Sequence, residues 1–439
     1  MKEITKEFLD QELKEIANDK SQTIFRHALA KHSLNDVCST SDQSVNPDLN
    51  FDIDIKTRSV TAQNHTGRCW IFAACNMIRE KIANELDIPE FELSQSYLAF
   101  YDKIEKSNFF MKKIEEVLDR NYDDRTFSYI LDGGLQDGGQ WDMVVNIINK
   151  YGILPKNAFP DTYNANNSTQ YRNLLDFNLR KFSYEAKEVY KKEGIEAVKK
   201  LEEEYLKKIY HLLVSLYGIP TKEFDFEYTS KDGKYHKEHF NNPLEFKEKY
   251  LGNLLDDYIS VVNVPSKTKP FNTLYVTYYQ GNVIEGNKVS FLNIDLDRFK
   301  ELILNQLRDK QITWFAADVS YYGDRQNGVW DDTSFDFKTS TGFDFDMPKG
   351  EIFNYRASII SHAMCITGVA FEEGVPSKWK IENSWGTDIG NKGYFVMSSS
   401  WFDRFVYQAV INKKYLNSEE LKAIKENKVM LDPWDILGI

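Results

Sequence analysis

The sequence has 439 residues, of which 42% are hydrophobic, and a formal net charge of −12 at pH 7. This length exceeds a single ordinary core, so two or three lobes are expected. The negative charge argues against nucleic-acid binding as a main role, because affinity for phosphates requires clustered cations. Four cysteines are too few for a disulfide scaffold and favour a reducing compartment.

No stretch approaches the roughly 18 apolar residues of a membrane span. Residues 1–6 lack the apolar core of a signal peptide. The sequence therefore predicts a cytoplasmic protein with no membrane partner.

The chain opens with an amphipathic helical pattern over residues 1–25, followed by an extended arm, rich in Ser, Asp and Asn, over residues 35–60. A glycine-containing loop, residues 63–70, then leads into a helix that ends near Leu86. Apolar residues after Cys69 recur at helical spacing and give this helix one apolar face. Cys69 is thus expected at a helix N-terminus, where free N–H groups and the helix dipole favour a thiolate.

Two glycine pairs, Gly133-Gly134 and Gly138-Gly139, follow a mostly helical and charged stretch. Glycines this close together mark a loop where the backbone bends or where another group approaches it. An ordinary turn is one interpretation, and a backbone strip that pairs with an extended ligand is the other.

Residues 165–260 differ in character, because Lys and Glu alternate with apolar residues at helical spacing. This pattern predicts long solvated helices, which we interpret as a helical insertion. His236 and His239 have a spacing that metal sites use, but no strong third ligand follows them, so no metal site is predicted.

Beyond about residue 270 the pattern changes to short strands with one intervening helix, residues 297–307. The predicted strands are residues 273–279, 312–319, 364–371, 378–383 and 393–397. Helices first and an antiparallel sheet later indicate an α+β fold.

Cysteine catalysis requires a base for the thiol and a third group to hold that base. His362 is the isolated histidine of the strand-rich part, and Asn383 follows 21 residues later at a strand end, close to Trp385. An Asn carbonyl can orient an imidazole, and a Trp can shield their bond from water. A core histidine and a turn asparagine are the ordinary alternatives, but Cys69, His362 and Asn383 in this order favour catalysis. Gln63 could supply an oxyanion donor.

These residues stand in longer motifs: Thr66-Gly67-Arg68-Cys69-Trp70, Asp137-Gly138-Gly139-Gln140-Trp141-Asp142-Met143, Ser361-His362-Ala363-Met364 and Glu382-Asn383-Ser384-Trp385-Gly386. Together they resemble the papain-like cysteine peptidases, and most closely the bleomycin hydrolase and bacterial aminopeptidase C branch, over nearly the whole chain. The resemblance implies a papain-like two-lobe fold, with a helical lobe, an antiparallel β-barrel-like lobe, a helical insertion and two terminal arms. The expected divisions are an N-terminal helix and arm (1–60), a helical lobe with the nucleophile (61–164), the insertion (165–260), a β lobe with His and Asn (261–425) and a C-terminal arm (426–439).

The resemblance also implies roles for single residues. Cys69 would be the nucleophile, His362 its base, and Asn383 the residue that orients His362. Gln63 and the Cys69 backbone N–H would form the oxyanion hole, and Trp385 would cover the His–Asn bond. A thiolate–imidazolium pair is expected, with no metal or cofactor.

Gly138 and Gly139 would pair with an extended peptide substrate, and the carboxylate of Ile439 would bind the substrate's free amino group. Members of this branch form homohexamers, so a homohexamer is expected. Their tails typically end Trp-Asp-Pro-Met-Gly-Ala-Leu-Ala, whereas this tail, matched from Trp434, stops about two residues earlier. The sequence thus predicts an intracellular aminopeptidase. An oligopeptide endopeptidase of the same family and a non-catalytic binding scaffold are the alternatives.

Two departures from papain itself agree with this assignment. Papain's motif Cys-Gly-Ser-Cys-Trp begins with a disulfide cysteine, and Thr66 takes that place here, as a reducing compartment requires. His362 follows Cys69 by 293 residues rather than by about 130–150. The insertion accounts for the excess.

Overall fold

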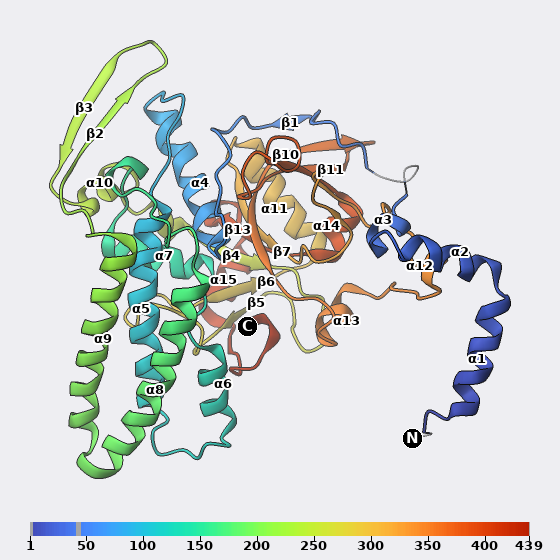
Figure 1. Ribbon diagram of the computed structural model, residues 1–439. Coiled ribbons are helices and arrows are strands. Elements are labelled where there is room, and N and C mark those ends of the chain that lie inside the picture. Colours follow the sequence, from blue (N-terminus) through green and yellow to red (C-terminus); the bar gives the residue numbers. More distant parts are fainter. Residues whose placement is uncertain (1–2, 41–44, 439) are drawn as a thin grey trace.

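The computed structural model describes residues 3–40 and 45–438. It has two halves side by side, one mainly helical and one built on a large sheet, with the carboxyl end of the chain between them (Figure 1). One cluster of buried apolar side chains fills the helical half and reaches one face of the sheet, and a second lies among the strands and helices of the sheet half. The main helices of the helical half are α4 (Cys69–Glu85), α5 (Gln95–Glu115), α6 (Arg125–Gly133), α7 (Trp141–Tyr151), α8 (Thr169–Glu193), α9 (Ile195–Tyr217) and α10 (Pro243–Tyr250).

Helix α4 is buried on all sides from Trp70 to Glu80, not on one face as its spacing predicts, and only its last turn reaches the surface. It contacts α5 and α7 in its own half and β10 (His362–Glu372) and β7 (Thr313–Ala317) in the sheet half. Even its polar residues Asn76, Arg79 and Glu80 are buried. A helix enclosed by both halves must match polar partners as well as apolar ones, and a pattern of hydrophobic spacing does not show this.

The other strands of the main sheet are β1 (Ile53–Asp54), β4 (Tyr258–Val262), β5 (Thr273–Val276), β6 (Ser290–Asn293), β8 (Gly323–Asp324), β9 (Val329–Trp330), β11 (Val375–Glu382), β12 (Tyr394–Ser398), β13 (Val406–Asn412) and β14 (Lys428–Met430). Their order is β14-β5-β6-β4-β13-β7-β10-β11-β12-β9-β8, with β1 paired to β10. The centre is antiparallel, as predicted, but β4–β6, β5–β14 and β9–β12 are parallel. Each parallel pair joins strands linked by long connections, which is what parallel pairing requires.

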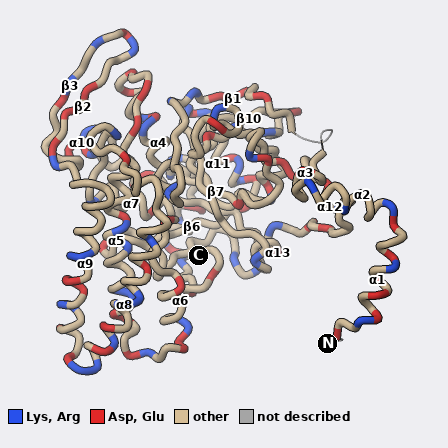
Figure 2. Tube along the Cα trace, viewed as in Figure 1, with Lys and Arg blue, Asp and Glu red and all other residues tan. Residues whose placement is uncertain are grey.

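The predicted all-helical insertion is wrong in its second part. Helices α8 and α9 are antiparallel and carry acidic and basic residues along their lengths (Figure 2). A hairpin, β2 (Phe224–Thr229) and β3 (Tyr235–Phe240), follows them and projects from the helical half. Its first strand alternates buried and exposed residues, which is the period of a strand. The proposed boundary at residue 260 also falls inside β4.

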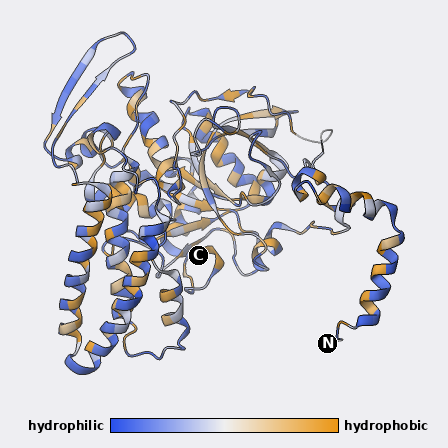
Figure 3. Ribbon diagram, in the orientation of Figure 1, coloured by the Kyte–Doolittle hydropathy of each residue, from blue (hydrophilic) through white to orange (hydrophobic). Residues whose placement is uncertain are grey.

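The N-terminal arm consists of α1 (Lys6–Asn18), α2 (Lys20–Leu29) and the short α3 (Leu34–Cys38), and α1 projects away from both halves (Figure 1). Neither α1 nor α2 has a buried residue. Their apolar side chains alternate with polar ones along the arm (Figure 3), and the exposed apolar ones include Ile4, Phe8, Leu9, Leu13, Ile16 and Ile24. After the arm, the chain is held to the sheet by β1.

Helices α11 (Leu296–Arg308), α12 (Phe337–Thr341), α13 (Lys349–Asn354), α14 (Ser399–Phe405) and α15 (Ser418–Glu426) complete the sheet half. Among residues 3–40 and 45–438, no helix is both long and apolar enough to cross a membrane.

Candidate active site

Cys69 is the first residue of α4, where the sequence places it. The loop of the two glycine pairs is tied to this helix start. The Gly67 N–H donates to the Asp137 carboxylate (3.1 Å), and Trp70 Nε1 donates to the Asp137 carbonyl (2.8 Å). A Cβ on Gly139 would lie 2.7 Å from the Trp70 ring. This close approach explains the glycine and holds the loop beside the thiol.

His362 and Asn383 come from neighbouring strands. His362 begins β10, and Asn383 directly follows β11, with which β10 is antiparallel. His362 Nε2 lies 2.8 Å from Asn383 Oδ1, which also accepts the Ser384 N–H at 2.7 Å. Because Oδ1 is an acceptor, Nε2 must carry the proton, and this leaves Nδ1 as the basic nitrogen. The Trp385 ring stacks on the imidazole with 4.7 Å between ring centres.

Gln63 is linked to the same corner of the sheet half. Its backbone N–H donates to the Ser384 carbonyl, and the Ser384 hydroxyl donates to Gln63 Oε1, both at 2.8 Å. These bonds orient the Gln63 amide, and its Nε2 donates one N–H to the Thr66 carbonyl (2.6 Å). Nε2 has two N–H donors. Ser384, which joins Gln63 to Asn383, was not singled out from the sequence.

Cys69 and His362 open onto one cleft of about 500 Å³ between the two halves. Gly138, Gly139 and Gly438 also line it. Sequence reasoning therefore identifies residues from four distant segments that the fold brings together. His236 and His239 lie elsewhere, on β3, where His239 Nδ1 meets Asp225 (2.8 Å). No group of three or more metal-binding side chains occurs within residues 3–40 and 45–438.

Two lysines of α5, which lie in the stretch predicted to be helical and charged, support the cleft. Lys106 Nζ donates to the carbonyls of Gly138 (2.6 Å) and Gln136 (3.1 Å) and pairs with Asp102 (2.8 Å). Lys103 pairs with the Asp137 carboxylate at 2.6 Å. Both lysines are buried. Because they bind carbonyls and a carboxylate of the loop, they fix the backbone strip of Gly138 and Gly139. The only feature of the sequence that indicates this arrangement is the spacing of Asp102 and Lys106, which places them on the same face of a helix.

The C-terminal tail reaches this cleft at Gly438, the last described residue. Strand β14 pairs with β5, and Lys269 Nζ then holds the Asp435 carboxylate at 2.6 Å. Arg356 donates to the Trp434 carbonyl (3.1 Å), and the Arg125 guanidinium lies 3.7 Å above the Trp434 ring. Leu437 is buried in the core and Gly438 lines the cleft. Ile439 lies outside the described residues.

Burial of the Cys69 thiol and of the His362 imidazole favours the neutral form of each. Burial lowers the pKa of His362 to about 4, although the Asn383 hydrogen bond acts in the opposite direction. Burial likewise raises the pKa of the Cys69 thiol, and backbone N–H groups offset only part of this effect. Each of these shifts, taken for one group alone, opposes the expected thiolate–imidazolium pair. Transfer of the proton creates both charges together, so their mutual attraction offsets the cost of burial.

Comparison with known proteins extends these observations to the whole chain. Residues 3–438 match the Peptidase C1-like family. The chain belongs to this family. It is 40% identical to Aminopeptidase C of Lactobacillus delbrueckii subsp. lactis over 100% of this chain and 98% of that protein. It is 37% identical to Aminopeptidase C of Listeria monocytogenes over 99% and 98%.

A solved structure, PepW from Lactobacillus rhamnosis, is 39% identical and covers 100% of this chain and 99% of its own, with a TM-score of 0.96. The predicted family and the α+β, papain-like two-lobe fold are thereby confirmed. A member of this family is a cysteine-type peptidase, so the catalytic class predicted from the sequence is confirmed as well.

Proposed function

We propose that this protein is an aminopeptidase that releases N-terminal residues from peptides through Cys69. The observation that carries the proposal is that Cys69, His362 and the tail residue Gly438 line the same cleft. A nucleophile and a base make peptide hydrolysis possible. A tail inside the cleft limits how far the substrate can extend beyond the residue that is released.

In the proposed reaction, His362 Nδ1 accepts the proton of the Cys69 thiol while Sγ attacks the carbonyl carbon of the scissile bond. The carbonyl oxygen becomes an oxyanion, which accepts hydrogen bonds from Gln63 Nε2 and the Cys69 backbone N–H. The C–N bond then breaks, and the imidazolium gives its proton to the departing amine. Water attacks the thioester, again with His362 as base, and the Cys69 thiol is regenerated.

The remaining residues act by holding these groups. Asn383 keeps Nδ1 of His362 as the free nitrogen, and the stacked Trp385 shields the His–Asn bond from water. The backbone of Gly138 and Gly139, held by Lys106, pairs with the extended substrate.

Selection for a free N-terminus would come from the tail. Gly438 lies in the cleft, and Lys269 and Arg356 fix the segment that precedes it. We propose that the carboxylate of Ile439, one residue further on, binds the substrate's ammonium group. A charge-assisted hydrogen bond of this kind contributes about 1.5–3 kcal/mol.

The test compares a peptide that has a free amino group with the same peptide acetylated at its N-terminus. We expect kcat/KM for the free peptide to be at least about 10-fold higher, because acetylation removes the charge and adds atoms where the tail lies. Cleavage of both peptides at similar rates would favour the alternative, an endopeptidase. No turnover of either peptide, despite a folded protein, would favour a binding scaffold.

We propose that the protein acts as a homohexamer in the cytoplasm. The exposed apolar side chains of α1 and α2 support the assembly, because two helices without a buried residue gain most by packing on a second copy. The four free cysteines agree with a reducing compartment.

Sedimentation of the wild-type chain and of a variant that lacks residues 1–32 tests the assembly. We expect a hexamer for the wild type and smaller species for the variant. The double substitution Phe8→Asp/Leu13→Asp should act like the deletion, whereas Lys14→Asp, on an exposed polar position of the same helix, should leave the hexamer intact. A wild-type monomer, or a deletion variant that remains hexameric, contradicts the proposal.

A further inference from the structure

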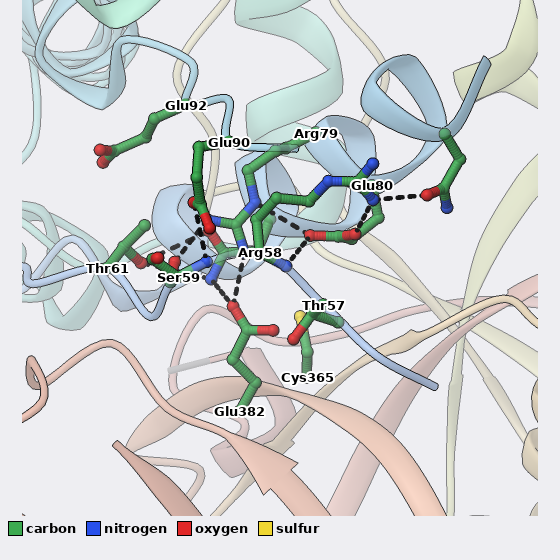
Figure 4. A network of polar contacts seen from close by, with 12 residues as sticks. Thr57, Arg58, Ser59, Thr61, Arg79, Glu80, Glu90, Glu92, Cys365 and Glu382 are labelled. Atoms are coloured by element: carbon green, nitrogen blue, oxygen red, sulfur yellow. Dashed lines mark hydrogen bonds and ion pairs between the residues drawn. The ribbon is translucent and has the colours of Figure 1, made fainter. Parts of the chain in front are cut away.

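Four charged side chains form a buried cluster: Arg58, Arg79, Glu80 and Glu382 (Figure 4). Arg58 Nη1 lies 2.6 Å from Glu80 Oε2, and Arg79 Nη2 lies 2.8 Å from Glu382 Oε1. Arg79 Nε also contacts Glu80 (3.2 Å). Two positive and two negative charges balance, and each of the four residues is at most 6% exposed. Removing four charges from water is costly, so the cluster is not explained by stability alone.

The Arg79–Glu382 contact joins the two halves at the active site. Arg79 is on α4, the helix that begins with Cys69, and Glu382 is the last residue of β11, directly before Asn383. Asn76, also on α4, donates to the same Glu382 oxygen at 3.0 Å. Cys365, the β10 partner of Glu382, donates its thiol to the Ala73 carbonyl of α4 (3.3 Å). The nucleophile's helix is thus fastened to the strand ends that carry the base and its orienting residue.

The same cluster fixes the segment that leads to Gln63. Arg79 Nη1 donates to the Ser59 carbonyl (2.9 Å), and the Arg58 backbone N–H donates to Glu80 (2.9 Å). The segment ends at Gln63, whose backbone N–H is bound to Ser384. Cys69, His362, Asn383 and Gln63 therefore all belong to segments that contact this one polar cluster. None of the contacts named above involves a residue that lines the cleft.

We infer that Arg79 and Glu382 are positioning residues, which set the separation of the Cys69 thiol from the His362–Asn383 pair. An apolar pair could hold helix against sheet at least as strongly, but it has no preferred direction. A guanidinium that binds Glu80 through Nε and Glu382 through Nη2 has its orientation fixed by both bonds. Burial raises the pKa of the Glu382 carboxyl, and Arg79 offsets part of this rise. The raised pKa reflects the cost of keeping a charge at this buried position.

The decisive variant is the apolar double substitution Arg79→Met/Glu382→Met, which removes both charges and keeps similar volumes. We expect it to fold with a Tm near that of the wild type. We expect kcat per active site to fall about 10- to 100-fold with little change in KM, because a misplacement near 1 Å costs up to about 100-fold in rate. Active sites are counted by titration with an irreversible thiol reagent. We also expect iodoacetamide to alkylate Cys69 more slowly in the double variant than in the wild type when the rate is measured across a range of pH. The reason is that the alkylation rate depends on His362.

A matched control is available in the sheet half, where Arg298 of α11 and Glu420 of α15 form another ion pair at 2.7 Å. Arg298→Met/Glu420→Met should leave kcat unchanged. If the first double variant fails to fold, Glu382→Gln is the second test, since it keeps the shape and removes the charge. We expect Glu382→Gln to lower kcat severalfold, and Glu382→Asp to retain more activity than Gln does.

Wild-type kcat per titrated site in the folded double variant, or in Glu382→Gln, would overturn the inference. A loss of activity that only follows a loss of folded protein would overturn it too. The inference rests on the proposed function, but the two fail differently: an inactive wild type contradicts the function, whereas an active wild type with unaffected variants contradicts only the positioning role.

Discussion

Cys69→Ala should abolish peptide hydrolysis, with kcat/KM reduced on the order of 10⁴- to 10⁶-fold, as expected when the nucleophile of a catalytic set is removed. No other described thiol can replace it. Cys75 and Cys365 are fully buried, and burial raises the pKa of both thiols. Neither of these two thiols lines the cleft, which contains Cys69.

The measurement is kcat/KM with a free-amine peptide, with the Tm recorded for each variant. Cys38→Ala serves as the matched control, because Cys38 is buried in the N-terminal arm and its loss should leave turnover intact. Cys69→Ala protein that is folded and retains wild-type hydrolysis would refute the assigned nucleophile, and with it the reaction proposed above.

Deletion of residues 436–439 should convert the enzyme toward endopeptidase activity. The deletion removes the buried Leu437, the cleft-lining Gly438 and the carboxylate proposed to bind the ammonium group. We expect kcat/KM for N-acetylated peptides to rise and kcat/KM for free-amine peptides to fall. The ratio of the two should change by about 10- to 150-fold, which corresponds to one charge-assisted bond of about 1.5–3 kcal/mol.

Ile439→Ala is the control for this deletion, since it changes the side chain and keeps a terminal carboxylate. It should retain the preference for free amines. If the deletion leaves the ratio unchanged, the tail has no part in choosing the end of the substrate, and the preference must arise elsewhere in the cleft.

The positions of Cys69, His362 and Asn383 in the fold could be predicted because their signals are local. A cysteine at a helix start needs only the helical pattern that follows it, and a histidine and an asparagine at neighbouring strand ends need only adjacent strands. The interactions that hold them are not local. Arg79 and Glu382 are 303 positions apart, and nothing in either segment indicates that they meet.

The errors have a related cause. The burial of Lys103 and Lys106 was not predicted, since a charged residue on a helix normally faces water. They are buried because the loop of Gly138 offers carbonyls and the carboxylate of Asp137 as partners. The hairpin of β2 and β3 was missed because the lysines and glutamates around it continue the composition of the helices before it.

The pairing of β1 with β10 has a mechanical consequence for the arm that precedes it. Ile53 lies opposite Val369, the Ile55 N–H donates to the Thr367 carbonyl (2.9 Å), and Lys380 holds Asp54 at 2.7 Å. These bonds anchor the chain between the projecting helices and Gln63, so we expect a displacement of α1 and α2 to stop at this anchor before it reaches Gln63. The proposed association of subunits through the arm and the proposed turnover at Cys69 are therefore expected to be separable properties, which substitutions on either side of the anchor would alter independently.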